Sequence, residues 1–418
     1  SSSRSVVVLR KAQIEVTGLS HPSLVSRGQS NIPVDISVFN SGEVAANIRD
    51  FNFTHAGLYV IDSFPPYPDI LPGDTVTYNF LFDVLPNSGT GTDLISISIL
   101  GKDSISSNVV TADSSFSWVI EVESNVEIVS VNPSQSIVSR GQSGVGVSVI
   151  LRNQGGVSVL IDSVALQFSN GDTNYTGITL GSLTDTLFSG GVDTLQLSVG
   201  VNSNAVTGSE IIDASVFGVN LTTTDPIIVS GATTPGSWTV QQRPQIAVPS
   251  LTLSSDTVST GQGGLALNFR LSNIGGGVPT ATAQVDSIHL VINGMEGDTT
   301  QFSFTPQFNT PFVMVNNAEL LLSYSLSVSP TALSGNYRFQ STVYYQDIND
   351  GNLFNLSGGS GASDTVLVQQ AGSIVIDSVR TPVSSASVGQ TGIPVQVYFS
   401  NPGKRWWMLG LPRSILTE

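Results

Sequence analysis

The sequence predicts an all-β protein that consists of tandem antiparallel β-sandwiches. Three features of the 418 residues support this prediction. One motif occurs four times, the apolar residues inside each copy alternate with polar ones, and Gly, Asn, Asp and Ser separate many short apolar runs. Short strands divided by turn residues are typical of a sandwich, and recurrence at a long, nearly constant period is typical of a tandem array.

The repeated motif begins with a Gly-Gln pair and ends with Asn-x-Gly. The first glycines are Gly28, Gly141, Gly261 and Gly389, so successive copies are 113, 120 and 128 residues apart. The closing residues are Asn40 and Gly42, Asn153 and Gly155, Asn273 and Gly275, and Asn401 and Gly403. We expect turns at both ends of the motif, because Asn hydrogen-bonds its own backbone and Gly accepts a positive φ.

Between the two turns, apolar side chains occupy every second position. They are Ile32, Val34, Ile36 and Val38; Val145, Val147, Val149 and Leu151; Leu265, Leu267, Phe269 and Leu271; and Ile393, Val395, Val397 and Phe399. A period of two predicts a strand with one face in a core. Because a one-residue slip would turn all four side chains outward, the register is strongly specified.

Further strand-like runs surround this central strand in each copy, and no amphipathic helix is evident. About seven short strands in about 115 residues predict an antiparallel Greek-key sandwich of the immunoglobulin type. The motif places repeat one at 12–124, repeat two at 125–244 and repeat three at 245–371. An incomplete fourth repeat covers 372–418, and its tail from Lys404 departs from the pattern.

The first residues and the short linkers predict how the repeats are arranged along the chain. Residues 1–11 resemble the closing strand of a preceding repeat, so we expect the chain to be a segment of a longer array. Linkers such as Gln241-Gln242-Arg243-Pro244 are only a few residues long, which favours an elongated, semi-rigid rod.

Composition excludes several classes of function. The chain has no Cys, which rules out disulfides and thiolate chemistry. Its formal net charge of −16 argues against a nucleic-acid partner, because no dense basic patch is present. No apolar run reaches the about 18 residues of a membrane helix. Local motifs for zinc, phosphate or a nucleophilic serine are missing, so we expect no enzyme activity and no cofactor.

The run Asp347-Ile348-Asn349-Asp350-Gly351-Asn352 is the best candidate for a metal site. Alternating oxygen ligands in a turn suit Ca²⁺, which would use Asp347, Asn349, Asp350 and Asn352. The ligand spacing of known calcium loops is not met, however, and repeats one and two carry different residues here. The sequence therefore favours an ordinary hairpin turn and leaves calcium as the alternative.

The four tryptophans admit two interpretations each. Trp118 and Trp238 occupy the same place in repeats one and two, where they serve either packing or the stacking of a sugar. Packing is favoured, because recurrence at one position of a repeat is typical of a framework residue. The pair Trp406-Trp407 is either an exposed aromatic patch or part of a tail that does not belong to the repeat.

The repeat length, the opening strand, the Gly-Gln turn and the strand that ends in Asn-x-Gly resemble a bacterial and archaeal family. It is the immunoglobulin-like "cell adhesion related domain found in bacteria". The resemblance covers three repeats and two fragments. It implies a secreted or cell-surface protein in which tandem domains serve as a stalk, spacer or adhesive module, and it carries no catalytic residues.

Three functions remain open from the sequence. The first is a non-enzymatic extracellular spacer, whose partners are neighbouring repeats or surface glycans and proteins. The second is a filament subunit, in which Val6, Val7, Val8 and Leu9 donate a strand to the open sandwich of another copy. The third is a carbohydrate-binding region of a large secreted enzyme, with a site on loops such as 294–317 of repeat three.

Overall fold

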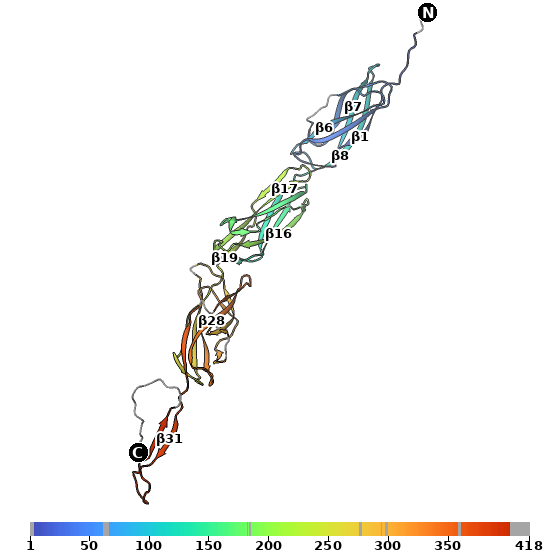
Figure 1. Ribbon diagram of the computed structural model, residues 1–418. Helices are drawn as coiled ribbons and strands as arrows, with labels where there is room; N and C mark the ends of the chain where they lie inside the picture. Colours follow the sequence, from blue (N-terminus) through green and yellow to red (C-terminus); the bar gives the residue numbers. More distant parts are fainter. Residues whose placement is uncertain are drawn as a thin grey trace. The chain divides into compact units, whose positions relative to one another are not determined.

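The computed structural model describes residues 4–61, 67–181, 183, 185–275, 278–293, 295–296, 300–357 and 361–401. The described residues form 32 strands and a single 3₁₀ turn, Asp172–Asn174 (Figure 1). The prediction of an all-β chain of tandem sandwiches is confirmed. Within the described residues there is no helix long and apolar enough to span a membrane.

Repeat one contains eight described strands in two four-stranded sheets. They are β1 (Ile14–Ser20), β2 (Leu24–Ser26), β3 (Ile32–Asn40), β4 (Ala46–Thr54), β5 (Tyr59–Ile61), β6 (Thr75–Val84), β7 (Gly91–Asp103) and β8 (Val109–Glu121). One sheet has the order β1-β3-β6-β5 and the other β2-β8-β7-β4. The apolar side chains between these sheets form one core.

Repeat two follows the same plan with additional short strands. They are β9 (Val126–Pro133), β10 (Ile137–Ser139), β11 (Val145–Asn153), β12 (Val159–Phe168), β13 (Tyr175–Thr176), β14 (Thr179–Leu180), β15 (Asp185–Leu187), β16 (Val192–Val201), β17 (Gly208–Asn220), β18 (Pro226–Ser230) and β19 (Gly236–Gln241). The sheet orders are β13-β16-β11-β9 and β10-β19-β17-β12-β14, with β15 paired to β12 and β18 to β17.

Repeat three has the same two sheets. Its strands are β20 (Ile246–Leu253), β21 (Thr257–Ser259), β22 (Leu265–Asn273), β23 (Ala283–Ile292), β24 (Met295–Glu296), β25 (Phe302–Pro306), β26 (Phe312–Met314), β27 (Glu319–Val328), β28 (Gly335–Asp347), β29 (Leu353–Leu356) and β30 (Asp364–Gln369). The orders are β20-β22-β27-β25 and β21-β30-β28-β23-β24, with β26 on β23 and β29 on β28. The stretch 294–317, expected to be a loop, contains β25 and β26.

In the fourth repeat the described residues form only β31 (Val375–Arg380) and β32 (Gln396–Ser400), paired antiparallel. Gly403 and the tail with Trp406-Trp407 lie outside the described residues. The alternating pattern of this repeat predicts buried side chains, and this prediction was wrong. Val395 and Phe399 are each 43% exposed, because among the described residues β31 alone pairs with β32 and no second sheet covers them.

The chain divides into two compact units. The first consists of 1–136, 143–202 and 209–238, and the second of 137–142, 203–208 and 239–418. The division passes through repeat two, because one end of that repeat groups with repeat three. Figure 1 labels strands of both units, for example β6 and β16 of the first and β28 of the second.

The alternating positions of the first three motifs face the cores. The twelve apolar side chains at these positions of β3, β11 and β22 are at most 5% exposed. Burial of each such side chain stabilises the fold by about 1.5–3 kcal/mol. One pairing was not expected from an antiparallel plan, since β2, β10 and β21 each run parallel to the closing strand of their repeat.

The asparagine of each motif does more than form a turn. Asn40 is buried, and its Oδ1 accepts hydrogen bonds from the N–H groups of Gly42 (3.0 Å) and Gln13 (3.2 Å). Its Nδ2 donates to the carbonyls of Val44 (2.8 Å) and Ile70 (3.0 Å). One side chain therefore ties the segment that enters the repeat to the end of β3. A side chain at Gly42 would collide with this entering segment at the Lys11 carbonyl.

Asn153 makes the equivalent bonds to Gly155, Asn125 and Val157 in repeat two. Asn153→Ala should lower the free energy of unfolding of repeat two by about 2–4 kcal/mol, because buried backbone groups lose their partners. Denaturant titration of the whole chain would measure this. The control is Arg152→Ala, whose side chain is exposed on the same strand and should be nearly neutral. Equal stability of the two variants would contradict the assignment.

Candidate functional site

A polar cluster lies inside repeat one, where β5, β7 and β8 meet. The Tyr59 hydroxyl donates to Asp93 Oδ2 at 2.6 Å, and Trp118 Nε1 donates to the Tyr59 oxygen at 2.7 Å. The N–H groups of Ala56 and Gly57 also donate to the Asp93 carboxylate. Burial would raise the pKa of Asp93, but these hydrogen bonds outweigh it and hold the pKa below its ordinary value.

Repeat two has a related cluster built from Tyr175, Glu210 and Trp238, in which the ring centres of Tyr175 and Trp238 lie 5.7 Å apart. The Tyr175 hydroxyl donates to Glu210 Oε2 at 2.8 Å, and Ser169 and Asn170 donate to Glu210 Oε1. Glu210 is fully buried. Burial raises the pKa of the Tyr175 hydroxyl, and its carboxylate partner raises it further. The Tyr175 hydroxyl is thus held in its neutral form, and hydrogen-bond donors occupy both oxygens of Glu210. This arrangement stabilises the core and does not present Glu210 as a general base.

Repeat three replaces all three residues. Tyr59, Tyr175 and Phe302 pair with Val84, Val201 and Val328 in their sheets, so they are equivalent. In repeat three the acid position holds Tyr337 and the tryptophan position holds Val366, and these two pair directly. Because the tyrosine, the acid and the tryptophan are all replaced in repeat three, none of these side chains is left there without the others as hydrogen-bond partners. This replacement indicates that the cluster serves packing.

The buried tryptophans and two of the histidines make contacts within the repeats. Trp118 and Trp238 are 1% and 2% exposed, so neither indole face can stack on a sugar. His21 stacks on Phe116, and His55 contacts the Gly57 carbonyl through Nδ1. No group of three metal-binding side chains occurs within the described part of the chain.

The ends of the repeats carry a second set of recurring polar contacts. Three turns, which we call joint turns, occupy Asp103–Asn108, Asn220–Asp225 and Asp347–Asn352. In each, the first residue donates its N–H to the carbonyl of the last, and the fifth residue has positive φ. The first side chain also accepts N–H bonds from within the turn. The three turns therefore share one conformation.

The other oxygen or nitrogen of that first side chain contacts the segment that enters the repeat. Asp103 Oδ2 accepts the Ala12 N–H at 2.8 Å, and Asn220 Nδ2 donates to Ser124 Oγ at 3.2 Å. Pro244 takes the equivalent place in repeat three and has no N–H to donate. There Asp347 Oδ2 faces Arg243 Nη1 at 3.7 Å instead.

The Gly-Gln motifs form the opposite end of each repeat. In Ser26–Gln29, Ser139–Gln142, Ser259–Gln262 and Ser387–Gln390 the serine N–H donates to the glutamine Oε1 at 2.8–3.1 Å. Gly28, Gly141, Gly261 and Gly389 have φ between 72° and 88°. Positive φ explains why glycine precedes the glutamine, and the side-chain bond explains the glutamine.

Joint turns contact Gly-Gln turns inside both units. In the first unit, Gln29 Nε2 donates to the Thr222 carbonyl at 3.3 Å. In the second unit, Asn349 Nδ2 donates to Ser139 Oγ at 2.9 Å and to Gln241 Oε1 at 3.0 Å. The candidate functional site is therefore the joint between consecutive repeats.

The four candidate calcium ligands lie in the third joint turn. Asp350 Oδ2 pairs with Arg243 Nη2 at 2.8 Å, Asn349 bonds across the joint, and Asn352 Nδ2 donates to Asp350. Burial raises the pKa of Asp347, and the Ser139 hydroxyl and Arg243 oppose this. The hydrogen bonds fit the hairpin-turn interpretation, because a guanidinium already lies against both carboxylates.

The residues predicted to donate a strand lie outside every sheet of the described residues. Val6, Val7 and Val8 are 84%, 78% and 88% exposed, and Leu9 is 45% exposed. Leu9 and Val7 line a hollow with Lys11, Val44 and the first joint turn. Donation to another copy therefore remains a prediction.

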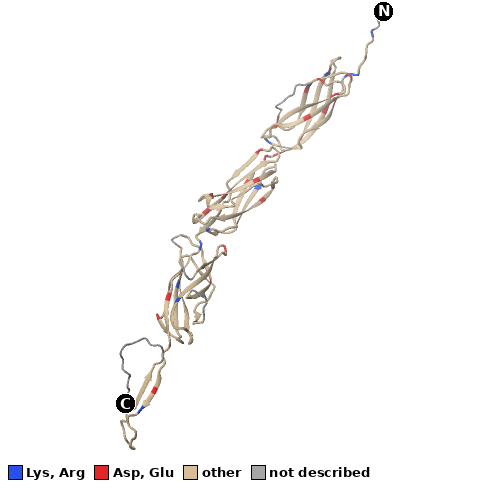
Figure 2. Ribbon diagram, viewed as in Figure 1, with Lys and Arg blue, Asp and Glu red and all other residues tan. Residues whose placement is uncertain are grey.

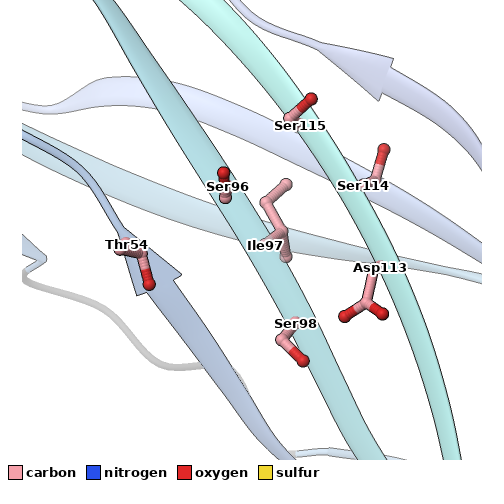
Figure 3. Close-up of a pocket in the computed structure, with 7 residues that line it drawn as sticks. All are labelled: Thr54, Ser96, Ile97, Ser98, Asp113, Ser114 and Ser115. Carbon is pink, nitrogen blue, oxygen red and sulfur yellow. The ribbon is translucent and has the colours of Figure 1, made fainter.

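One outer sheet face of repeat one carries a shallow depression lined mainly by polar side chains. Figure 3 shows a depression on repeat one lined by Thr54 of β4, Ser96 and Ser98 of β7, and Asp113 and Ser115 of β8. These side chains are exposed, and the depression lacks the enclosed apolar walls of a ligand pocket. Figure 2 shows acidic residues scattered over the repeats and few basic ones.

Comparison with known proteins gives likeness at the level of fold only. No family model and no curated protein matches the chain, so the resemblance to the adhesion-related family has no support from sequence comparison. A putative membrane-anchored protein from Corynebacterium diphtheriae shares 12% identity over 86% of this chain and 96% of its own, with a TM-score of 0.19.

Two further solved structures are similar at the same level. Domains D0–D1 of intimin share 10% identity over 53% of this chain and 95% of their own, with a TM-score of 0.17. The E. coli alpha-2-macroglobulin shares 9% over 90% of this chain, with a TM-score of 0.20, and the match spans 25% of its length. Such scores carry no functional assignment.

Asp103 provides a test of the joint turns in acid. Hydrogen bonds from the Ser106 and Ala12 N–H groups lower its pKa to about 2. Its contribution to stability is present above the unfolded pKa of about 3.9 and is lost as pH falls toward the folded value. Denaturant titrations of repeat one should therefore show stability decreasing from about pH 4 to about pH 2.

Asp103→Asn should be less stable at neutral pH and should lack this part of the acid dependence. Asp113→Asn, on an exposed face of β8, is the control and should keep the dependence of the unaltered chain. If Asp103→Asn loses stability over the same pH window as the control, the ionised Asp103 does not anchor the entering segment.

Proposed function

We propose that the chain is a non-enzymatic extracellular spacer, in which tandem immunoglobulin-like sandwiches hold something at a distance. One observation carries the proposal: each complete repeat has its own core, and the segment that enters it is hydrogen-bonded to the repeat itself. The N–H groups of Gln13, Asn125 and Gln245 all donate to the motif asparagine. Little free chain therefore separates one repeat from the next.

The composition supports an extracellular location. The surface is rich in uncharged Ser, Thr, Asn and Gln, and charged residues make up only 11% of the chain. The lack of Cys leaves no thiol to oxidise outside the cell. The described residues offer no cluster of catalytic groups beyond carboxylates that core donors already hold. A mechanical role needs none of these groups.

Single-molecule stretching of the whole chain tests the spacer. The three complete repeats should unfold in separate steps, each releasing roughly 35–40 nm of contour length for about 115 residues. Asn153→Ala should lower the force of one step and leave the others unchanged. Unfolding in a single step, or a change in every step, would show that the repeats do not bear load independently.

A second candidate function is a filament subunit that assembles by strand donation. The observation in its favour is unpaired apolar surface at two places. Val6, Val7 and Val8 are exposed, and in the two-stranded fourth repeat Ile376 and Val379 are each 59% exposed. If residues 6–8 of one copy were donated as a strand, they would cover the exposed face of the fourth repeat of another copy.

Negative-stain microscopy over a concentration range tests assembly. The intact chain should form regular fibres, and deletion of residues 1–11 should abolish them. A variant with Val6, Val7 and Val8 changed to Ser keeps the length of this segment and should also fail to assemble. Fibres from the deletion variant, or none from the intact chain, would reject strand donation.

A further inference from the structure

We propose that Arg243 and the joint turn Asp347–Asn352 form a charged latch that fixes the joint between repeats two and three. The joint between repeats one and two has Glu123 and Asn220 at the corresponding positions, lacks this latch and bends more readily. The proposal concerns the joints alone and holds whether or not the chain is a spacer.

Arg243 is held on several sides. Its Nη2 lies 2.8 Å from Asp350 Oδ2 and its Nη1 3.7 Å from Asp347 Oδ2. The guanidinium carbon lies 5.3 Å from the centre of the Phe354 ring. A Cβ added to Gly141 would lie 3.4 Å from Arg243 Nε, so the guanidinium also rests against the Gly-Gln turn of repeat two. Arg243 thus bridges the end of repeat two and the joint turn of repeat three.

Asn349 makes the second half of the latch. Its amide nitrogen donates to Ser139 in the Gly-Gln turn and to Gln241 at the end of β19. Both acceptors belong to repeat two, whereas Asn349 belongs to repeat three. The joint turn is therefore bonded to the preceding repeat by a side chain that its own conformation does not require.

The side chains involved are shielded from water. The side chains of Asp347, Asp350 and Arg243 are 0%, 6% and 21% exposed. Exposed ion pairs contribute little, but loss of one partner of a buried pair leaves an uncompensated charge. The short linker keeps the two repeats at high effective concentration, so a few such contacts suffice to hold the joint closed.

The charges at the equivalent positions differ between the repeats. Because Gln13, Asn125 and Gln245 make equivalent bonds, Lys11, Glu123 and Arg243 are equivalent, two residues before each. The first joint-turn residues are Asp103, Asn220 and Asp347. In repeats one and three the linker residue is a cation and the first joint-turn residue is an aspartate. In repeat two the linker residue is the anion Glu123 and the first joint-turn residue is the neutral Asn220. Repeat two thereby avoids like-charge repulsion, but it has no ion pair at its joint.

The joint between repeats one and two is bonded more weakly across the repeats. Gln29 Nε2 donates to the Thr222 carbonyl at 3.3 Å. In the described residues no salt bridge joins repeat one to repeat two. Backbone bonds also cross both joints. The Gly156 N–H donates to the Val122 carbonyl at the first joint, and the Gln242 and Ala281 N–H groups donate to the Pro279 and Gln242 carbonyls at the second. The side-chain contacts add to this difference, so stiffness varies along the chain.

Spin-label distance measurements on the full chain test the latch. The chain has no native Cys, so cysteines can be placed at exposed sites without background. Labels at Gln196 and Ser325 span the joint between repeats two and three, and labels at Ser98 and Gln196 span the joint between repeats one and two. The first pair should give the narrower distance distribution.

Arg243→Gln combined with Asn349→Ala should broaden the distribution across the second joint by about two-fold, because an ion pair and two hydrogen bonds are lost. The distribution across the first joint should stay unchanged. Glu123→Gln is the matched control at the equivalent position and should alter neither joint. Melting of each variant checks that all repeats remain folded.

A second measurement needs no substitution in the latch. Because salt screens a buried ion pair much less than an exposed one, the second joint of the unaltered chain should stay the narrower one even at about 1 M salt. Two results would overturn the proposal: equal widths at the two joints of the unaltered chain, or a second joint whose width does not change in the double variant. If the double variant does not fold, the comparison of the two joints in the unaltered chain decides.

Discussion

One buried asparagine in each complete repeat fixes the segment on which the rest of that repeat depends. Its oxygen accepts an N–H group from the entering segment, and in repeats one and two also one from the following turn, while its nitrogen donates to backbone carbonyls of neighbouring segments. No aliphatic residue can satisfy these buried backbone groups. The start of the repeat, the end of its central strand and the neighbouring loop are therefore fixed as one unit. The position of the joint turn relative to the linker follows from this arrangement.

Much of the fold follows from local pattern, because the period-two alternation and the turn residues are each local properties. The strands of the first three motifs and their buried faces agree with the sequence prediction. The same alternation failed at Val395 and Phe399, since burial needs an opposing sheet that one strand cannot specify. The parallel pairs β2–β8, β10–β19 and β21–β30 join residues about a hundred positions apart, which no local pattern reveals.

The joint was missed for a related reason. The residues Asp347 to Asn352 were interpreted by ligand spacing, whereas their partner Arg243 lies in the preceding linker. A signal was present in the sequence: when the repeats are aligned on the motif asparagine, with a one-residue gap in repeat one, Lys11, Glu123 and Arg243 fall in one column. Comparison of that column with Asp103, Asn220 and Asp347 shows the matched charges. The tyrosine–acid–tryptophan clusters could be found in the same way, because repeat three changes all three positions together.

Pro244 illustrates how a single backbone feature affects the evolution of such an array. Without an N–H at this position, Asp347 depends on Arg243, and both residues belong to the segment that begins at the linker. A crossover in the linker ahead of Arg243 would move the pair together into a new neighbourhood. A repeat such as the third can therefore be duplicated or moved as an intact cassette that carries the counter-charge of its own joint turn.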